Sequence, residues 1–180
     1  MRITGISTTW LDYPDNRSQA VIVYFSGCSH GCKGCQNEKY QNFKNDESYS
    51  IEVQELNERV REACLKNRTN KVVFSGGDPL FPKNVTDVAL VIDQLKNQYS
   101  LDICVYTGYN IEDVKHIYKN PCLSELSRPT FFKCGKYLED LKRDSWGKSD
   151  QDMKWVSTNQ NLYDENFNLV SLDGVYTFKS

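Results

Sequence analysis

The sequence lacks a long apolar run, because no stretch of its 180 residues approaches the roughly 20 apolar residues that cross a bilayer. Residues Met1 to Ile6 lead into polar sequence, so no secretory signal peptide is visible. An excess of one charge is also lacking, since 22 basic and 24 acidic residues are mixed along the chain. With a net charge of −2, no global basic field indicates binding to nucleic acid or to a membrane surface.

Internal repeats, low-complexity tracts and interdomain linkers are lacking as well. The chain is long enough to bury one core, so we expect a single domain over residues 1–180. Its core is expected over about 20–151, followed by a C-terminal extension over about 152–180. No Ser/His/Asp or paired-carboxylate constellation is visible, so nothing indicates a general base.

Cysteine is not lacking, and the count of seven is odd. Without a visible export signal, an odd count argues for reduced thiols and cofactor ligation in a cytosolic protein. Three of the thiols, Cys28, Cys32 and Cys35, fall within eight residues at the spacing C-x3-C-x2-C, with glycines interspersed. We call residues 28–35 the cysteine loop.

The cysteine loop has the composition of an iron–sulfur site, because thiolates are the soft ligands that such clusters need. The glycines allow positive φ and let backbone N–H groups point at an anionic cluster. Three thiolates satisfy only three irons of a four-iron cluster, so the fourth iron stays open to a non-protein ligand. The alternatives are zinc, with His30 or a remote side chain as fourth ligand, a disulfide, and unligated loop cysteines.

Apolar runs typical of buried strands alternate with amphipathic helical patterns. The expected strands are residues 20–25, 71–75, 101–106 and 129–133. The expected helices follow N-caps at Ser50, Asn84 and Asn110, the first running through Lys66. This order implies parallel βαβ units with right-handed crossovers. The segments 153–156, 167–170 and 175–178 instead suggest short antiparallel strands.

Unusual residues follow each expected strand. The cysteine loop follows the first, Gly76-Gly77-Asp78-Pro79 the second and Thr107-Gly108-Tyr109 the third. Because the carboxyl ends of parallel strands lie together, we expect these three motifs to line one cleft. Cys134 also follows a strand and by the same argument lies near the cleft, although a buried thiol is the usual interpretation. The remaining cysteines are interpreted as core or loop residues: Cys64, Cys104 and Cys122.

Three stretches together resemble a known family. They are Phe25 to Asn37, Phe74 to Pro82 and Val105 to Tyr109. In this order they are similar to the activating proteins of anaerobic ribonucleoside-triphosphate reductase, within the radical S-adenosylmethionine (SAM) superfamily, over about residues 25–151. The resemblance implies an α/β fold, namely a partial, open (β/α) barrel of radical SAM type with a short antiparallel C-terminal extension.

The resemblance also implies the roles of individual residues. Cys28, Cys32 and Cys35 would hold a [4Fe–4S] cluster whose unique iron is chelated by the amino and carboxylate groups of SAM. The implied cofactor-binding residues are Gly34, Cys35 and Gln36 at the adenine, Gly76, Gly77 and Asp78 at the methionine amino group, and Thr107. The chemistry of these residues is consistent with such roles. Two adjacent glycines allow the backbone to approach the zwitterionic methionine end of SAM, and the Asp78 carboxylate is a hydrogen-bond acceptor for its ammonium group. An ordinary strand-to-helix turn is the alternative for Gly-Gly-Asp-Pro.

The implied activity is that of a radical SAM oxidoreductase. One electron from the cluster cleaves SAM to methionine and a 5′-deoxyadenosyl radical, which takes a hydrogen atom from a backbone glycine of the partner. The implied partners are the large subunit of the anaerobic reductase and an external one-electron donor such as flavodoxin, without nucleic acid or membrane.

Other functions stay open. The chain could activate another glycyl-radical enzyme of the pyruvate formate-lyase type, or act on a small molecule as 7-carboxy-7-deazaguanine synthase does. A non-enzymatic alternative is an iron–sulfur electron-transfer or zinc-binding module. A fourth cysteine at cluster spacing would favour electron transfer, and none stands near Cys35.

The chain departs from the family pattern in three places. Residues 12–17 replace a Gly-rich segment, which leaves the role of Arg17 open. Cys134-Gly135-Lys136 stands in place of Asp-Gly-Lys, and Trp146 to Gln151 stands in place of Arg-Gly-Ser-Ser-Asn-Gln. The missing Asp and Arg leave contacts to SAM or to the partner open in these segments.

The cysteine assignments predict the result of single substitutions. Cys→Ala at position 28, 32 or 35 should abolish normal assembly of a four-iron cluster from iron and sulfide. The same change at position 64, 104 or 122 should retain it, because those thiols are assigned to packing or loops. Iron and sulfide analysis with absorption spectroscopy measures the outcome. Stoichiometric zinc without iron-dependent activity would contradict the assignment.

Overall fold

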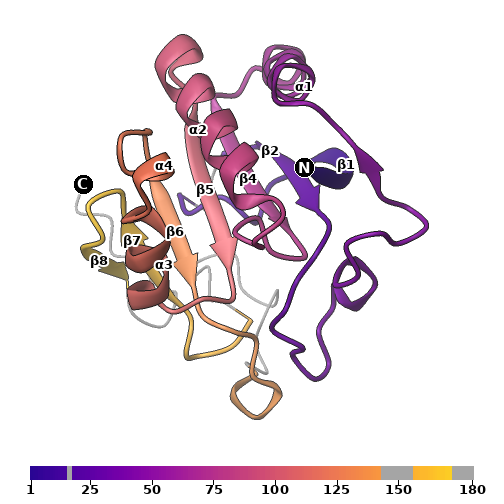
Figure 1. The fold of residues 1–180 in the computed structure, drawn as a ribbon, viewed down its shortest axis with the longest axis vertical. Coiled ribbons are helices and arrows are strands. Elements are labelled where there is room, and N and C mark those ends of the chain that lie inside the picture. The colour runs from indigo at the N-terminus through magenta and orange to yellow at the C-terminus, as the bar shows by residue number, and fades with distance from the viewer. Residues whose placement is uncertain (16–17, 143–155, 172–180) are drawn as a thin grey trace.

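The computed structural model describes residues 1–15, 18–142 and 156–171. In these ranges eight strands form one sheet in the order β3-β1-β2-β4-β5-β6-β7-β8 (Figure 1). The strands are β1 (Arg2–Thr9), β2 (Ala20–Phe25), β3 (Tyr49–Ser50), β4 (Lys71–Gly76), β5 (Asp102–Thr107), β6 (Phe131–Cys134), β7 (Asn161–Asp164) and β8 (Leu169–Ser171). The helices are α1 (Val53–Asn67), α2 (Val85–Tyr99), α3 (Ile111–Tyr118) and α4 (Pro121–Ser124), with 3-10 turns η1 (Glu38–Tyr40) and η2 (Glu139–Leu141).

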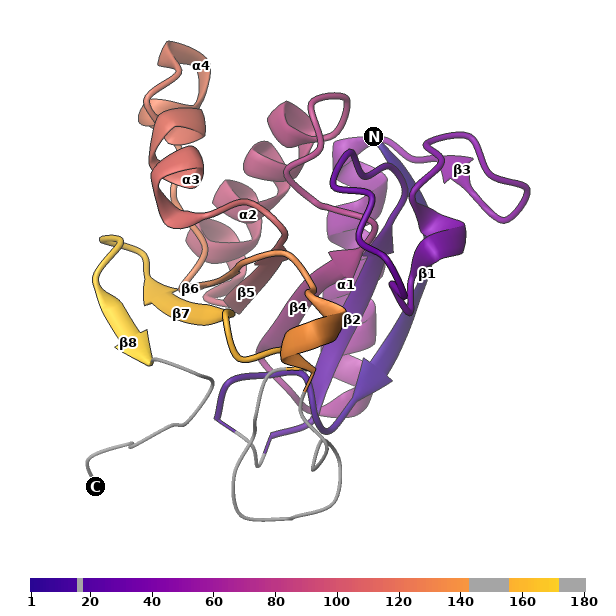
Figure 2. The same cartoon turned by 90° about the horizontal axis from the view of Figure 1, so that it is seen from below.

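The centre of the sheet is parallel and its flanks are antiparallel. Strands β2, β4, β5 and β6 pair in parallel, with Phe25 opposite Gly76 and Thr107 opposite Cys134. Strand β1 pairs antiparallel with β2, and β7 and β8 extend the other side antiparallel. Figure 2 shows β1 and β8 on opposite sides of a sheet that does not close. The predicted α/β class, with an open sheet and an antiparallel C-terminal extension, is confirmed to this extent.

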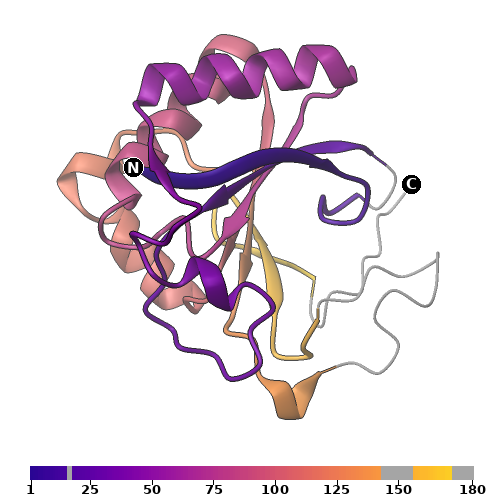
Figure 3. The same ribbon diagram turned by 90° about the vertical axis from the view of Figure 1, so that its right-hand side faces the viewer.

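The helices α1 and α2 cover one face of the sheet (Figure 3). Successive residues of a strand point to opposite faces, so Val23 and Phe74 enter the main core beneath these helices. Ile22 and Val73 belong to a second, smaller cluster together with Tyr13. Full burial of each large apolar side chain contributes about 1.5–3 kcal/mol to the free energy of folding. The two apolar clusters, one on each face, therefore stabilise the sheet.

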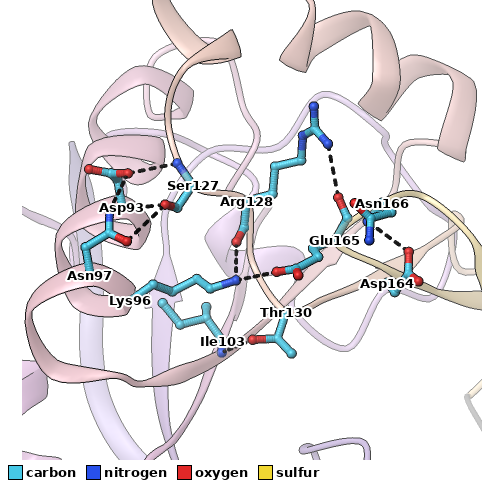
Figure 4. Close-up of polar contacts among 10 residues, drawn as sticks. All are labelled: Asp93, Lys96, Asn97, Ile103, Ser127, Arg128, Thr130, Asp164, Glu165 and Asn166. Carbon is cyan, nitrogen blue, oxygen red and sulfur yellow. Dashed lines mark hydrogen bonds and ion pairs between the residues drawn. The ribbon is translucent and has the colours of Figure 1, made fainter.

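Polar contacts attach the C-terminal strands to α2 (Figure 4). The Lys96 ammonium donates to the Arg128 carbonyl oxygen at 2.8 Å and to Glu165 Oε2 at 2.7 Å. The Ser127 backbone N–H donates to Asp93 Oδ1 at 2.8 Å. These contacts join α2 to the segment before β6 and to the turn between β7 and β8, and the pairing of β7 with β6 places the extension in the same sheet.

Most predicted elements are found close to their predicted positions. The four predicted parallel strands correspond to β2, β4, β5 and β6, with end positions shifted by at most two residues. The predicted cap at Asn110 is confirmed, because its side-chain oxygen accepts from the Asp113 backbone N–H at 2.9 Å. Of the predicted tail strands, 167–170 overlaps β8. Residues 153–155 and 175–178 lie outside the described residues.

Two predicted caps and the polar start of the chain are corrected. Helix α1 begins at Val53 rather than after Ser50, because Ser50 pairs with Arg2 in the short strand β3. Asn84 directly precedes α2, but its side chain does not cap the helix. It donates to the Ser26 carbonyl oxygen at 2.7 Å and accepts from the Arg2 N–H at 3.1 Å. Residues 2–9, where no strand is predicted, form β1.

No helix in the described ranges is both long enough and apolar enough to cross a membrane.

Candidate functional site

The three motifs that follow β2, β4 and β5 meet at one end of the parallel sheet, and Asp78 joins them. Its Oδ2 lies 2.7 Å from His30 Nε2 of the cysteine loop, 2.9 Å from Thr107 Oγ1 and 3.0 Å from the Gly108 backbone nitrogen. Its Oδ1 accepts from the Leu80 backbone N–H at 2.9 Å. Asp78 is 1% exposed. We call this set of contacts the Asp78 network.

The hydrogen-bond partners of the buried Asp78 carboxylate are a histidine ring, a hydroxyl and two backbone N–H groups. A buried carboxylate is costly unless it is hydrogen-bonded, and hydrogen bonds to an ionised acceptor are stronger than neutral ones. The carboxylate therefore holds the three motifs together, and loss of any one donor weakens its stabilisation.

Gly76 and Gly77 bring β4 against the base of the cysteine loop. Gly76 has φ of +102°, and a Cβ there would lie 2.5 Å from backbone atoms of Phe25. A Cβ on Gly77 would lie 2.6 Å from the Gly27 carbonyl oxygen and 2.7 Å from that of Tyr40. This close approach is a sufficient packing reason for both glycines, independent of any ligand.

Backbone hydrogen bonds fix the same region. The Gly77 N–H donates to the Phe25 carbonyl oxygen and the Asp78 N–H to that of Gly27, each at 2.8 Å. The Cys28 N–H donates to the Gln41 carbonyl oxygen at 3.0 Å. The start of the cysteine loop is thus attached to the turn after β4 through Phe25 and Gly27, and to the segment after η1 through Cys28.

The cysteine loop fits an iron–sulfur cluster in the number and type of its donors. All three thiols are free and half-buried, and Gly31 and Gly34 adopt positive φ of 60° and 69°. Burial raises the pKa of the Cys28 thiol to about 11, and a hydrogen bond from the His30 backbone opposes this rise. Within the described ranges no group of three or more His, Cys, Asp or Glu side chains is gathered closely enough to hold a metal ion. In a four-iron cluster each of the three thiolates would bind a different iron, and the left-handed glycines allow the loop backbone to wrap around such a cluster.

The second half of the loop faces the segment after β6. A Cβ on Gly34 would lie 3.1 Å from Glu139 Oε1, and the Lys33 ammonium lies 3.3 Å from Glu139 Oε2. Gly34 and Gln36 are exposed and Cys35 is half-buried. The three residues expected near the adenine therefore lie on the surface, beside η2.

A pocket of about 440 Å³ opens next to the Asp78 network. It is lined by His30, Gly108, Tyr109, Asn110 and Asp113 on one side and by Gly135, Lys136, Leu138 and Asn159 on the other. Thr107 is buried beside it, where its hydroxyl donates to Asp78 and accepts from the Tyr109 N–H at 3.2 Å. The pocket thus connects the cysteine loop with the carboxyl ends of β5 and β6.

His30 is the site residue that sequence reasoning missed, because it was interpreted only as a loop residue or a zinc ligand. Its position between two motif cysteines was the available signal.

Cys134 is buried opposite Thr107, and burial raises the pKa of its thiol. Cys64 and Cys104 are buried as predicted, whereas Cys122 is exposed on α4. Arg17 and residues 146–151 lie outside the described residues.

Comparisons with known proteins agree with the donor set. Residues 17–162 match the family model described as "4Fe-4S single cluster domain". The anaerobic ribonucleoside-triphosphate reductase-activating protein of Enterobacteria phage T4 is 28% identical over 150 residues, which are 82% of this chain and 90% of that protein. The protein of the same name from Escherichia coli K12 is 28% identical over 135 residues, covering 72% of this chain and 83% of its own. That from Haemophilus influenzae is 33% identical over 95 residues, covering 51% and 59%.

The Asp78 network predicts the effect of Asp78→Asn. Asparagine has one acceptor oxygen, where aspartate has two. Its NH2 group, which is a donor, must therefore replace either the oxygen that accepts from the Leu80 N–H or the oxygen that has the other three partners. We expect the free energy of unfolding of the metal-free protein to fall by about 2–4 kcal/mol in urea denaturation. The control is Asp46→Asn at an exposed carboxylate, expected to change it by less than about 0.5 kcal/mol. Equal effects of the two substitutions would contradict the role of the network.

Proposed function

The chain belongs to the 4Fe-4S single cluster domain family, and from this premise we propose that it is a radical SAM activase for anaerobic ribonucleoside-triphosphate reductase. The observation that carries the proposal is the Asp78 network. It joins the loop with three free thiols to the Gly-Gly-Asp-Pro and Thr-Gly-Tyr motifs at one end of a parallel sheet. The network supports the proposal because it brings together three distant segments that carry the residues we assign to the cluster and the cofactor.

In this proposal Cys28, Cys32 and Cys35 hold the cluster and leave one iron for SAM. When bound, the cluster supplies the electron that cleaves SAM to methionine and a 5′-deoxyadenosyl radical, which takes a hydrogen atom from the acceptor glycine. The protein positions these groups and excludes water from them. The buried turn after β4 supports the second task, because Asp78 and Leu80 are each 1% exposed.

For SAM we propose that backbone groups do most of the binding. Gly34, Cys35 and Gln36 are exposed or half-buried and would contact the adenine, while the half-buried Gly77, next to the buried Gly76, would contact the methionine end. The Asp78 Oδ2 atom already has three donors, whereas Oδ1 has the Leu80 N–H as its single donor in the described ranges. Oδ1 therefore has the capacity to accept a hydrogen bond from an ammonium. Thr107 contributes through Asp78, since its hydroxyl is donated to that carboxylate.

The proposed protein substrate is a glycine-bearing loop of the reductase large subunit, and the proposed electron source is an external donor such as flavodoxin. The half-buried thiols and the open pocket beside His30 support access from the surface for both. We propose that the open sheet is a partial barrel of radical SAM type in a single cytoplasmic domain. The run of four parallel strands with helices on one face supports this description.

The proposal predicts a radical on the partner. Reconstituted anaerobically with iron, sulfide and a reductant, the protein should cleave SAM slowly alone and faster with its cognate reductase, because the bound glycine loop completes the reacting geometry. We expect 5′-deoxyadenosine by chromatography and a doublet glycyl-radical signal by electron paramagnetic resonance (EPR).

Two variants serve as controls for this experiment. Cys32→Ala should abolish both signals, whereas Cys122→Ala, at an exposed thiol on α4, should keep both. Replacing the partner's acceptor glycine by alanine should remove the radical but leave the complex intact. An active cluster that cleaves SAM yet produces no radical on the reductase would contradict the proposal and favour a small-molecule substrate.

A further inference from the structure

His30 stands out within the cysteine loop because its side chain is 7% exposed, whereas every residue from 28 to 35 is half-buried or exposed as a whole. The ring leaves the loop and enters the end of the sheet, where Nε2 lies 2.7 Å from Asp78 Oδ2. The same oxygen accepts from the Gly108 N–H and the Thr107 hydroxyl, so we assign the hydrogen of this contact to His30 Nε2. This nitrogen is therefore committed to Asp78 and is not available as the fourth ligand of a zinc ion.

The neighbours of the ring are shaped to receive it. The Tyr109 ring packs edge-to-face against it, with 4.6 Å between centroids and 79° between planes. A Cβ on Gly108 would lie 2.3 Å from His30 Cδ2, so only glycine admits the ring at this distance. The Gly108 N–H and the ring also share the same acceptor, Asp78 Oδ2. The position of the His30 ring thus explains why the Thr-Gly-Tyr motif has glycine at position 108.

Few other contacts hold the middle of the loop. The Ser29 side chain hydrogen-bonds to Tyr109, and the Cys35 N–H donates to the Cys32 carbonyl oxygen at 3.3 Å. The Lys33–Glu139 ion pair is exposed, with 91% of the lysine side chain accessible, so it contributes little. The hydrogen bond from His30 to a buried carboxylate is the strongest of these attachments.

We infer that His30 is a positioning residue that docks the cysteine loop onto the ends of β4 and β5 through Asp78 before any cluster is bound. The inference deepens the proposed function, on which the ligand roles of the three thiols rest. The docking itself is a property of the metal-free protein. Because the His30 backbone N–H also hydrogen-bonds to Cys28, the ring fixes the amide that faces the first thiol.

Thiol reactivity of the metal-free, reduced protein tests the inference. We expect His30→Ala to raise the alkylation rate of the loop thiols by roughly tenfold, the factor expected when a hydrogen bond to a charged group no longer opposes local opening. Peptide mass spectrometry after timed iodoacetamide pulses reports the rate for each thiol. Cys122 supplies the exposed reference, and Cys64 in the core reports global unfolding.

Three further variants separate positioning from general destabilisation. His30→Gln places an amide N–H where Nε2 stood and should restore most of the protection. His116→Ala, at the other histidine of the chain, exposed on α3, should leave the rates unchanged. Gly108→Ala should reproduce the effect of His30→Ala by displacing the ring, and the double variant should be no more reactive than either single one.

The outcomes distinguish this inference from the proposed function, because neither iron nor SAM is present. Docking would be supported if His30→Ala raises the alkylation rate of the loop thiols alone. It would also require that His30→Gln restores the rate and that adding Gly108→Ala raises it no further. Unchanged loop rates in a folded His30→Ala protein, or an equal rise at Cys64, would overturn it.

Discussion

The arrangement of the site depends on one buried negative charge. The Asp78 carboxylate accepts hydrogen bonds from His30, Thr107, Gly108 and Leu80, and so from three segments that are far apart in the sequence. A buried carboxylate tolerates no loss of donors without a cost of the order of 1–3 kcal/mol or more. The cysteine loop, the turn after β4 and the turn after β5 are therefore constrained to one mutual arrangement.

The parallel sheet brings the three segments to one edge, and glycines allow them to approach closely enough to reach Asp78. Parallel pairing of β2, β4 and β5 brings their carboxyl ends to one edge, which is where such sheets bind ligands. Gly76 and Gly77 let β4 approach the base of the cysteine loop, and Gly108 admits the His30 ring. Each of these glycines therefore serves packing in the protein itself.

The parallel strands and the meeting of the three motifs were predictable, because buried apolar runs are local signals and parallel topology determines where they end. Other features were not, because they depend on partners distant in sequence. Ser50 was assigned to a helix cap, but strand pairing with Arg2 takes it into β3. Asn84 looked like a cap, yet it bonds to β1 and to the end of β2. The position of His30 between two motif cysteines marked it only as a residue of the loop, and its role follows from its distance to Asp78.

The most direct test of the account concerns the open iron. Electron–nuclear double resonance on the reduced, reconstituted protein, with SAM labelled by ¹⁵N at the methionine amino group, measures whether that nitrogen binds the cluster. We expect a ¹⁵N coupling in the native protein with labelled SAM and no coupling when labelled methionine alone is added. A cluster with four protein ligands and no coupling from labelled SAM would contradict the assignment of a three-cysteine site.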